Sequence, residues 1–193
     1  MTIEQNKAAN DYCMKLGALL GIIFLVQYAL LVLASTNLFF SLVRTPLMLV
    51  TPFILGLATY RLKERVFTDE FPWLVAWLYG IRIMLYASLI EAAGIVIYNQ
   101  WIDPANLYHM QQSLIAQYEE ARQMLAVTQP SDASLTGSIL KACDESITLM
   151  RESPVQTPIQ TAFASMANNL FGGMFWMTII ASIFYRKQNI KTT

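Results

Sequence analysis

The sequence predicts an all-α, polytopic membrane protein with four transmembrane helices and an extracytoplasmic helical hairpin between the third and the fourth. Three observations lead to this fold class. The chain is 55% hydrophobic and only 13% charged, whereas a soluble domain carries about 25% charged residues. It contains four apolar stretches close to the roughly 20 residues that a spanning helix needs. Its basic residues cluster at one end of each stretch. Residues 1–193 are therefore expected to form a single membrane domain.

The four predicted spans cover about residues 16–34, 38–60, 73–98 and 162–185, with edges uncertain by roughly three residues. The first stretch has a long leader that mixes acidic and basic residues. Its apolar run is longer than the roughly 7–15 residues of a signal peptide, and no typical cleavage site follows it. We therefore expect the first stretch to be retained as a span.

The distribution of lysine and arginine predicts the orientation in the membrane. Eight basic residues lie in three short segments on one side: Lys7, Lys15, Arg61, Lys63, Arg65, Arg186, Lys187 and Lys191. The other side carries three, Arg122, Lys141 and Arg151, in a segment that also holds seven acidic residues. The first side is therefore predicted to be cytoplasmic, with both termini there.

The segment of about 103–153 predicts the helical hairpin. Asp103-Pro104 is typical of a helix start. Apolar residues then recur at three- and four-residue spacing: Leu107, Met110, Leu114, Tyr118, Ala121 and Leu125. A polar stretch around Pro130 predicts a turn. A weaker second stripe follows it: Leu135, Ile139, Cys143, Ile147 and Met150. The second arm, the bundle or a partner protein is expected to cover the first stripe.

Three ionisable residues fall inside the predicted spans: Glu91, Arg44 and Arg82. Such residues are costly in lipid and are candidates for function. Glu91 shares a helix face with small residues, so we expect it to face protein. An ion pair between Glu91 and Arg44 is preferred, because each charge would otherwise be buried alone. Arg82 lies on the opposite side of its helix from Glu91, and is expected to meet Gln27 or to reach the cytoplasmic headgroups. The alternative to a structural ion pair is a proton, ion or lipid-headgroup site.

Strongly polar uncharged residues also occur inside the spans. Asn168, Asn169 and Gln27 form a candidate polar packing patch, because such side chains hydrogen-bond between helices in lipid. Gly17 and Gly21, four residues apart, are a similar signal for close helix packing. We expect these residues to join helices rather than to bind a ligand.

No catalytic, cofactor-binding or metal site is predicted. His109 is the one histidine, and no second histidine or paired cysteines accompany it at metal-ligand spacing. Cys13 and Cys143 are isolated and are predicted to lie on opposite sides of the membrane. Motifs of serine hydrolases, nucleotide-binding loops and zinc proteases are missing. The net charge is zero, so the chain has no excess of positive charge that would indicate nucleic-acid binding. The chain is therefore not expected to be an enzyme.

Several stretches resemble a bacterial family known only as domain of unknown function 4199. They are Gln100-Trp-Ile-Asp-Pro104 after the third span, the basic turn Tyr60-Arg-Leu-Lys-Glu-Arg65 with Phe71, and residues 171–187 at the end. The resemblance implies a small four-helix inner-membrane protein with a helical segment before the last span. It brings no activity or catalytic residues. Members of the family are often encoded near a membrane-associated glycosyltransferase, so the resemblance implies such an enzyme as a partner. Arg44 and Arg82 match no position of the family pattern.

The sequence thus predicts a non-enzymatic accessory or scaffold subunit of an inner-membrane assembly. Its expected partners are the lipid bilayer and another membrane protein, or a second copy of the chain, without nucleic acid and without a cofactor. The alternative is a small proton-coupled membrane transporter that uses Glu91.

Overall fold

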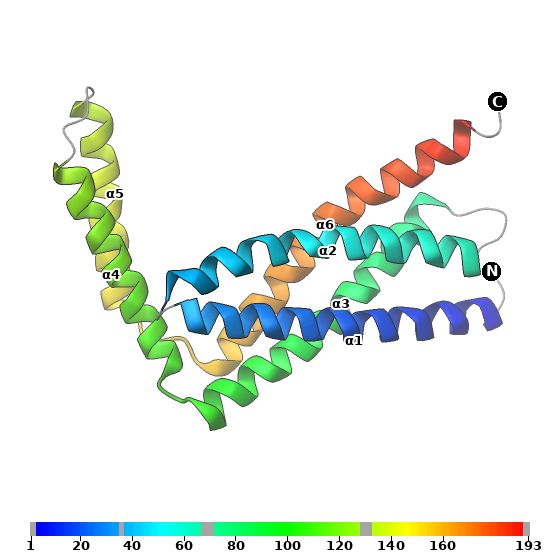
Figure 1. The fold of residues 1–193 in the computed structure, drawn as a ribbon, viewed down its shortest axis with the longest axis horizontal. Helices are drawn as coiled ribbons and strands as arrows, with labels where there is room; N and C mark the ends of the chain where they lie inside the picture. The colour runs from blue at the N-terminus through cyan, green and yellow to red at the C-terminus, as the bar shows by residue number, and fades with distance from the viewer. Residues whose placement is uncertain (1–2, 35–36, 67–71, 128–132, 191–193) are drawn as a thin grey trace. The chain divides into compact units, whose positions relative to one another are not determined.

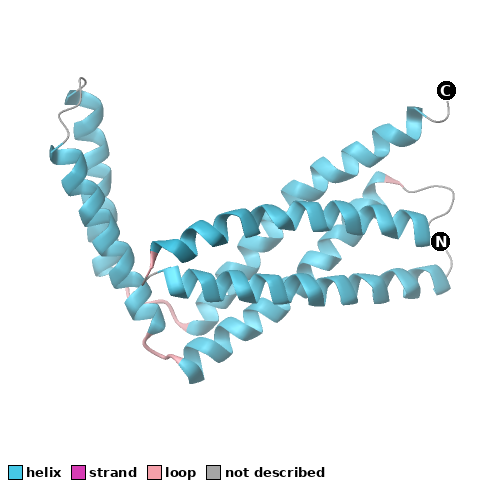
Figure 2. Cartoon of the chain, viewed as in Figure 1, coloured by secondary structure: helices cyan, strands magenta, loops and turns pink. Residues whose placement is uncertain are grey.

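The structure is a computed structural model that describes residues 3–34, 37–66, 72–127 and 133–190. Within these ranges it contains helices and no strand (Figures 1 and 2), which confirms the all-α prediction. The helices are α1 (Ile3–Ala34), α2 (Leu38–Val66), α3 (Trp73–Ile97), α4 (Asn106–Val127), α5 (Ala133–Glu152) and α6 (Pro158–Ile190). A short π-helical segment, Tyr98–Ile102, follows α3.

Four helices are long and apolar enough to cross a membrane, as predicted. Their candidate spans are Asn6–Ala34, Phe39–Glu64, Trp73–Ile102 and Pro158–Ile183. The structure divides into two compact units. One unit is Met1–Ile97 with Ile159–Thr193, and the other is Tyr98–Pro158. The first unit contains α1, α2, α3 and α6, and the second contains α4 and α5.

Helices α1 and α3 run in the same direction and pack closely through small residues (Figure 1). A Cβ atom on Gly17 would lie 2.5 Å from the Cβ of Tyr86, and one on Gly21 would lie 2.8 Å from the Cβ of Ile90. Only glycine leaves room for such an approach, as the Gly17–Gly21 spacing predicted. Each step of four residues along α1 thus matches a step of four along α3, which fixes the register of the two helices.

The helix α1 begins earlier than expected. The leader before residue 16 was predicted only as a mixed-charge flank, but the described helix begins at Ile3. Ala9 and Cys13 are fully buried in the core of this unit. The side chains of Asn6 and Asn10 accept hydrogen bonds from the hydroxyls of Tyr79 and Tyr86, at 3.1 and 3.2 Å. The leader is helical because α3 covers one of its faces with apolar and hydrogen-bonding groups.

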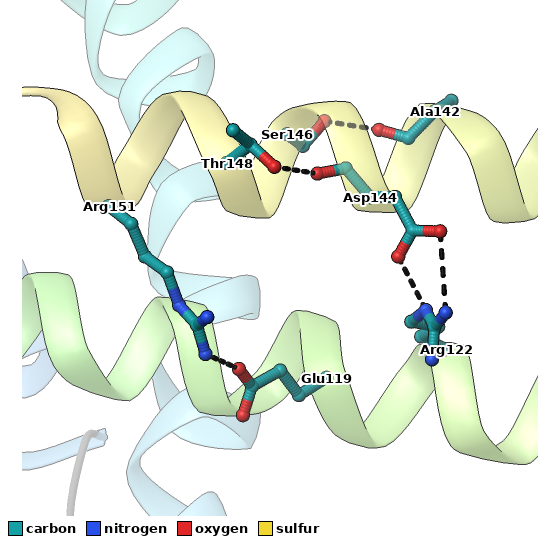
Figure 3. A network of polar contacts seen from close by, with 7 residues as sticks. All are labelled: Glu119, Arg122, Ala142, Asp144, Ser146, Thr148 and Arg151. Atoms are coloured by element: carbon teal, nitrogen blue, oxygen red, sulfur yellow. Dashed lines mark hydrogen bonds and ion pairs between the residues drawn. The ribbon is translucent and has the colours of Figure 1, made fainter.

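The second unit pairs α4 with α5. Arg122 of α4 bonds Asp144 of α5 at 2.5 Å, and Arg151 of α5 bonds Glu119 of α4 (Figure 3). The hydrogen bond and the negative charge of Asp144 raise the pKa of the Arg122 guanidinium. Gln111 adds a polar link, because its amide donates to the Met150 carbonyl at 2.6 Å. This carbonyl lies in the last turn of α5, where no intrahelical donor is available.

The start of α4 differs from the prediction. The helix begins at Asn106, and Asp103 closes the π-helical segment through a bond from its amide to the Tyr98 carbonyl at 2.8 Å. The buried Asn106 amide donates to Asn99 at 2.8 Å, so the π-helical segment is joined to the first turn of α4. The predicted turn around Pro130 lies outside the described residues.

Candidate functional site

The candidate site is the contact of Glu91 in α3 with two polar side chains of α6. Glu91 is only 7% exposed. The Ser165 hydroxyl donates to one carboxylate oxygen at 3.1 Å, and the Asn169 amide donates to the other. Both oxygens of a carboxylate inside an apolar span therefore have a partner from another helix. The prediction that Glu91 faces protein agrees with this geometry.

The face of α6 that carries the two donors also packs against α3 further toward the C-terminus of α6. Its contact residues recur every four positions: Ser165, Asn169, Gly173 and Met177. A Cβ on Gly173 would lie 2.6 Å from Met84 Cγ, and Met177 fills the space beside Gly80. The two helices are antiparallel, because the contacts move toward the N-terminus of α3 as they move toward the C-terminus of α6 (Figure 1). Glu91 thus lies at one end of a contact that continues through Met84 and Gly80 of α3.

Two tryptophan side chains extend this seam. The indole N–H of Trp77 donates to Thr178 at 3.2 Å, and that of Trp73 donates to Ser182 at 3.3 Å. Their rings are stacked, with centroids 6.1 Å apart. In an apolar environment, an indole N–H needs a protein acceptor or access to the interface. The hydroxyls of α6 provide that acceptor here.

The expected direct pair between Glu91 and Arg44 is not formed among the described residues. No ion pair within 4 Å joins them, and Arg44 Nε is buried without a hydrogen-bond partner. The register of the helices explains the separation. Gln27 of α1 donates to the Leu47 carbonyl of α2 at 3.1 Å, and Leu25 of α1 lies beside Gly94 of α3. Arg44, three residues before Leu47 in α2, therefore lies on the order of 10 Å beyond the level of Glu91, at 1.5 Å per residue.

Arg82 has a different environment from the one expected. Its guanidinium carbon lies 5.1 Å from the centroid of the Tyr79 ring, a cation–π contact. It does not meet Gln27, which is bonded to α2 instead. Tyr79 also contacts Asn6 near the start of α1, so Arg82 lies beside the polar part of that helix and not at the centre of the bundle. The expectation that Arg82 reaches the headgroups stays a prediction.

The three residues of the predicted polar packing patch do not come together. Asn169 bonds Glu91 and Gln27 bonds the backbone of α2. Asn168 is exposed on another side of α6. Consecutive residues of a helix point about 100° apart, so two adjacent asparagines cannot both face α3. Ser165 was not predicted as part of the site, although its four-residue spacing from Asn169 indicates the face of α6 that binds Glu91.

The arrangement joins helices and can hold a proton, but it offers no metal set. No group of three or more histidine, cysteine or acidic residues that could hold a metal ion occurs in the described ranges. His109 is exposed in α4 and contacts the Tyr108 ring, with centroids 5.9 Å apart. The partners of Glu91 are a neutral hydroxyl and a neutral amide. Structural linkage and reversible protonation are both compatible with a carboxyl group in such a setting.

Comparison with known proteins identifies a family without assigning an activity. The model of the family described as "Protein of unknown function (DUF4199)" matches residues 14–187. No match was found among curated proteins or among solved structures.

Proposed function

We propose that this chain, which belongs to the DUF4199 family of proteins of unknown function, is a non-enzymatic accessory or scaffold subunit of an assembly in the bacterial inner membrane. The observation that carries the proposal is the exposed apolar face of α4. Leu114 and Tyr118 are 46% and 40% exposed, whereas the neighbouring Ile115 is 5% exposed. A helix outside a membrane that leaves large apolar side chains exposed beside a buried one presents an association surface.

The pairing of α4 with α5 supports this role. The Arg122–Asp144 and Arg151–Glu119 bonds connect the two helices at two levels (Figure 3). Each exposed ion pair contributes little to stability alone. Two of them together with the Gln111 link hold the helices in one register. Because α5 already holds α4 in place, the exposed face of α4 would lose less conformational entropy when it binds a partner.

The proposal includes a topology with both termini in the cytoplasm and the α4–α5 pair on the opposite side. It rests on the asymmetry of lysine and arginine across the spans. A reporter that is active only outside the cytoplasm tests it directly. Fusion after Ser131 should give activity, and fusion after Thr193 should give none. The reverse result would refute the topology.

The scaffold role is tested by changing the α4 face in the full-length protein. Leu114→Asp and Tyr118→Asp should each reduce the recovery of a partner during affinity purification in mild detergent. Gln123→Asp is the matched control, because it adds the same charge at an exposed position on the opposite side of α4 from Leu114. A membrane-associated glycosyltransferase is the partner class proposed first. Equal recovery with all three variants would refute a binding role for this face.

The second candidate function is a small proton-coupled transporter that uses Glu91. It is favoured by one observation, namely that the buried carboxyl group bonds neutral side chains and no described cation within 4 Å. Such a group can take up and release a proton without breaking an ion pair. In reconstituted vesicles, Glu91→Gln should abolish solute uptake driven by a pH gradient while the bundle stays folded. Absence of such uptake by the parent protein would favour the scaffold.

A further inference from the structure

The exposed side of α6 contains a polar residue where lipid is expected. Asn168 is exposed, and no hydrogen bond joins its side chain to any other described residue. The fourth span begins at about residue 162 by the sequence prediction and at Pro158 in the structure, so Asn168 lies about 9–15 Å beyond its start along the helix. Its short side chain cannot reach the interface from there. Lipid tails offer neither donors nor acceptors, so an unsatisfied amide at this depth is costly.

The surface around Asn168 permits close approach of another helix. Ala164 and Gly172 lie one turn before and one turn after it, and both are exposed. A Cβ atom on Gly172 would meet nothing within 4 Å, whereas one on the adjacent Gly173 would contact Met84 of α3. Gly172 therefore makes no close contact with the other helices of this unit. Small residues on both sides of a polar one are the typical interface of associating membrane helices.

The chemistry of this face selects its partner. A carboxamide is both donor and acceptor, so two asparagines related by a two-fold axis satisfy each other. The three residues of the face carry no charge, so two copies would not repel each other. A two-fold interface must be self-complementary, and a central amide between two small residues meets that requirement. A helix with a different sequence would need a matching amide at the same depth.

We propose that the chain forms a homodimer through Ala164, Asn168 and Gly172 of α6, with the two Asn168 amides bonded across the two-fold axis. This interface lies on α6, away from the face that binds Glu91, and is independent of the α4 surface of the proposed scaffold. A chain that lacks any partner protein can still dimerise in this way. The two proposals therefore fail separately.

The experiment measures association of full-length protein in lipid vesicles by energy transfer between labelled copies, over a range of protein-to-lipid ratios. Asn168→Leu should weaken association about tenfold, the effect of roughly 1.4 kcal/mol for a hydrogen-bonded helix contact. Gly172→Leu should weaken it at least as much, because the added side chain separates the helices. Gly56→Leu is the matched control, since Gly56 lies in the span of α2 with nothing within 4 Å of its Cβ position.

A monomeric parent protein, or dimers that persist in both α6 variants, would overturn the proposal. So would an equal loss of association in Gly56→Leu. As a second measurement, Asn168→Cys in a Cys143→Ser background should give disulfide-linked dimers in membranes. The remaining Cys13 is fully buried and does not interfere. A crosslink to a different protein, with no crosslinked dimer, would also overturn the proposal.

Discussion

The hydroxyl of Ser165 donates a 3.1 Å hydrogen bond to the carboxylate of Glu91, across the contact between α6 and α3. Asn169 bonds the second oxygen of the same carboxylate. The buried acid is therefore bonded by the fourth span, whereas the charge pattern of the sequence had pointed to Arg44 in the second. Glu91 therefore joins α3 to α6 through two hydrogen bonds.

Removal of the Glu91 carboxylate should weaken the attachment of α6. Glu91→Ala leaves the Ser165 hydroxyl and the Asn169 amide without their acceptor, which should cost about 1–3 kcal/mol. Denaturation in detergent micelles, followed by circular dichroism, measures the loss. Ser88→Ala is the control, because that buried hydroxyl bonds only the Met84 carbonyl of its own helix. If Glu91→Ala lowers the free energy of unfolding no more than the control does, Glu91 does not stabilise the contact between α3 and α6.

A pair of double-mutant cycles separates the two possible partners of Glu91. The cycle with Asn169→Ala should show a coupling energy of about 0.5–3 kcal/mol, as expected for residues in contact. The cycle with Arg44→Ala should give a smaller value, because no bond within 4 Å joins the two side chains. The same unfolding measurements supply both cycles. Stronger coupling to Arg44 would restore the ion pair that the sequence predicted.

Gly17 should be far less tolerant of substitution than Gly56. Alanine at Gly17 places its Cβ 2.5 Å from Tyr86 Cβ and 2.9 Å from the Ile83 carbonyl oxygen, so α1 and α3 must separate. Overpacking of this kind costs about 1–3 kcal/mol. Gly56→Ala gains the helix propensity of alanine without a clash. The difference between the two unfolding free energies measures the cost of crowding the contact between α1 and α3. Equal values would show that these helices are too far apart for Gly17 to matter.

The two cysteines should differ in their reaction with a membrane-permeant maleimide. Cys13 is fully buried between α1 and α3, and its thiol lies 3.7 Å from the Tyr79 carbonyl. Cys143 in α5 is only partly buried. The folded protein should be modified at Cys143 first, with Cys13 reacting only after denaturation. Mass spectrometry of Cys143→Ser protein provides the test. Rapid modification of that variant would show that the start of α1 is not packed on α3.

The ion pair between Arg122 and Asp144 should depend on the sign of its charges. Arg122→Asp places two carboxylates together and should speed the proteolysis of the α4–α5 pair. Arg122 and Asp144 face each other across the two helices (Figure 3). The exchange Arg122→Asp with Asp144→Arg should therefore restore resistance, because the ion pair can form with its charges exchanged. Lys141→Asp is a suitable control, since its contact with Glu145 lies within α5 alone. No rescue by the exchange would indicate that the pair does not join the helices.

The sequence by itself determined the helical class and the four spans. Apolar stretches of spanning length have few alternatives in lipid, because a helix satisfies every backbone group internally. The close approach at Gly17 was also predictable, since a pair of glycines four residues apart marks one helix face. These features depend on spacing within a single helix, which the sequence records directly.

Only the tertiary structure decided which polar groups meet. The partner of Glu91 depends on the rotation of α6 and on the register of α3 against it, and neither is encoded in the composition of one span. A rotation of about 100° would exchange Asn169 for Asn168 at the contact. The helical start of α1 was missed for the same reason. Its polar leader is held by Tyr79 and Tyr86, which lie more than 70 residues later in the chain.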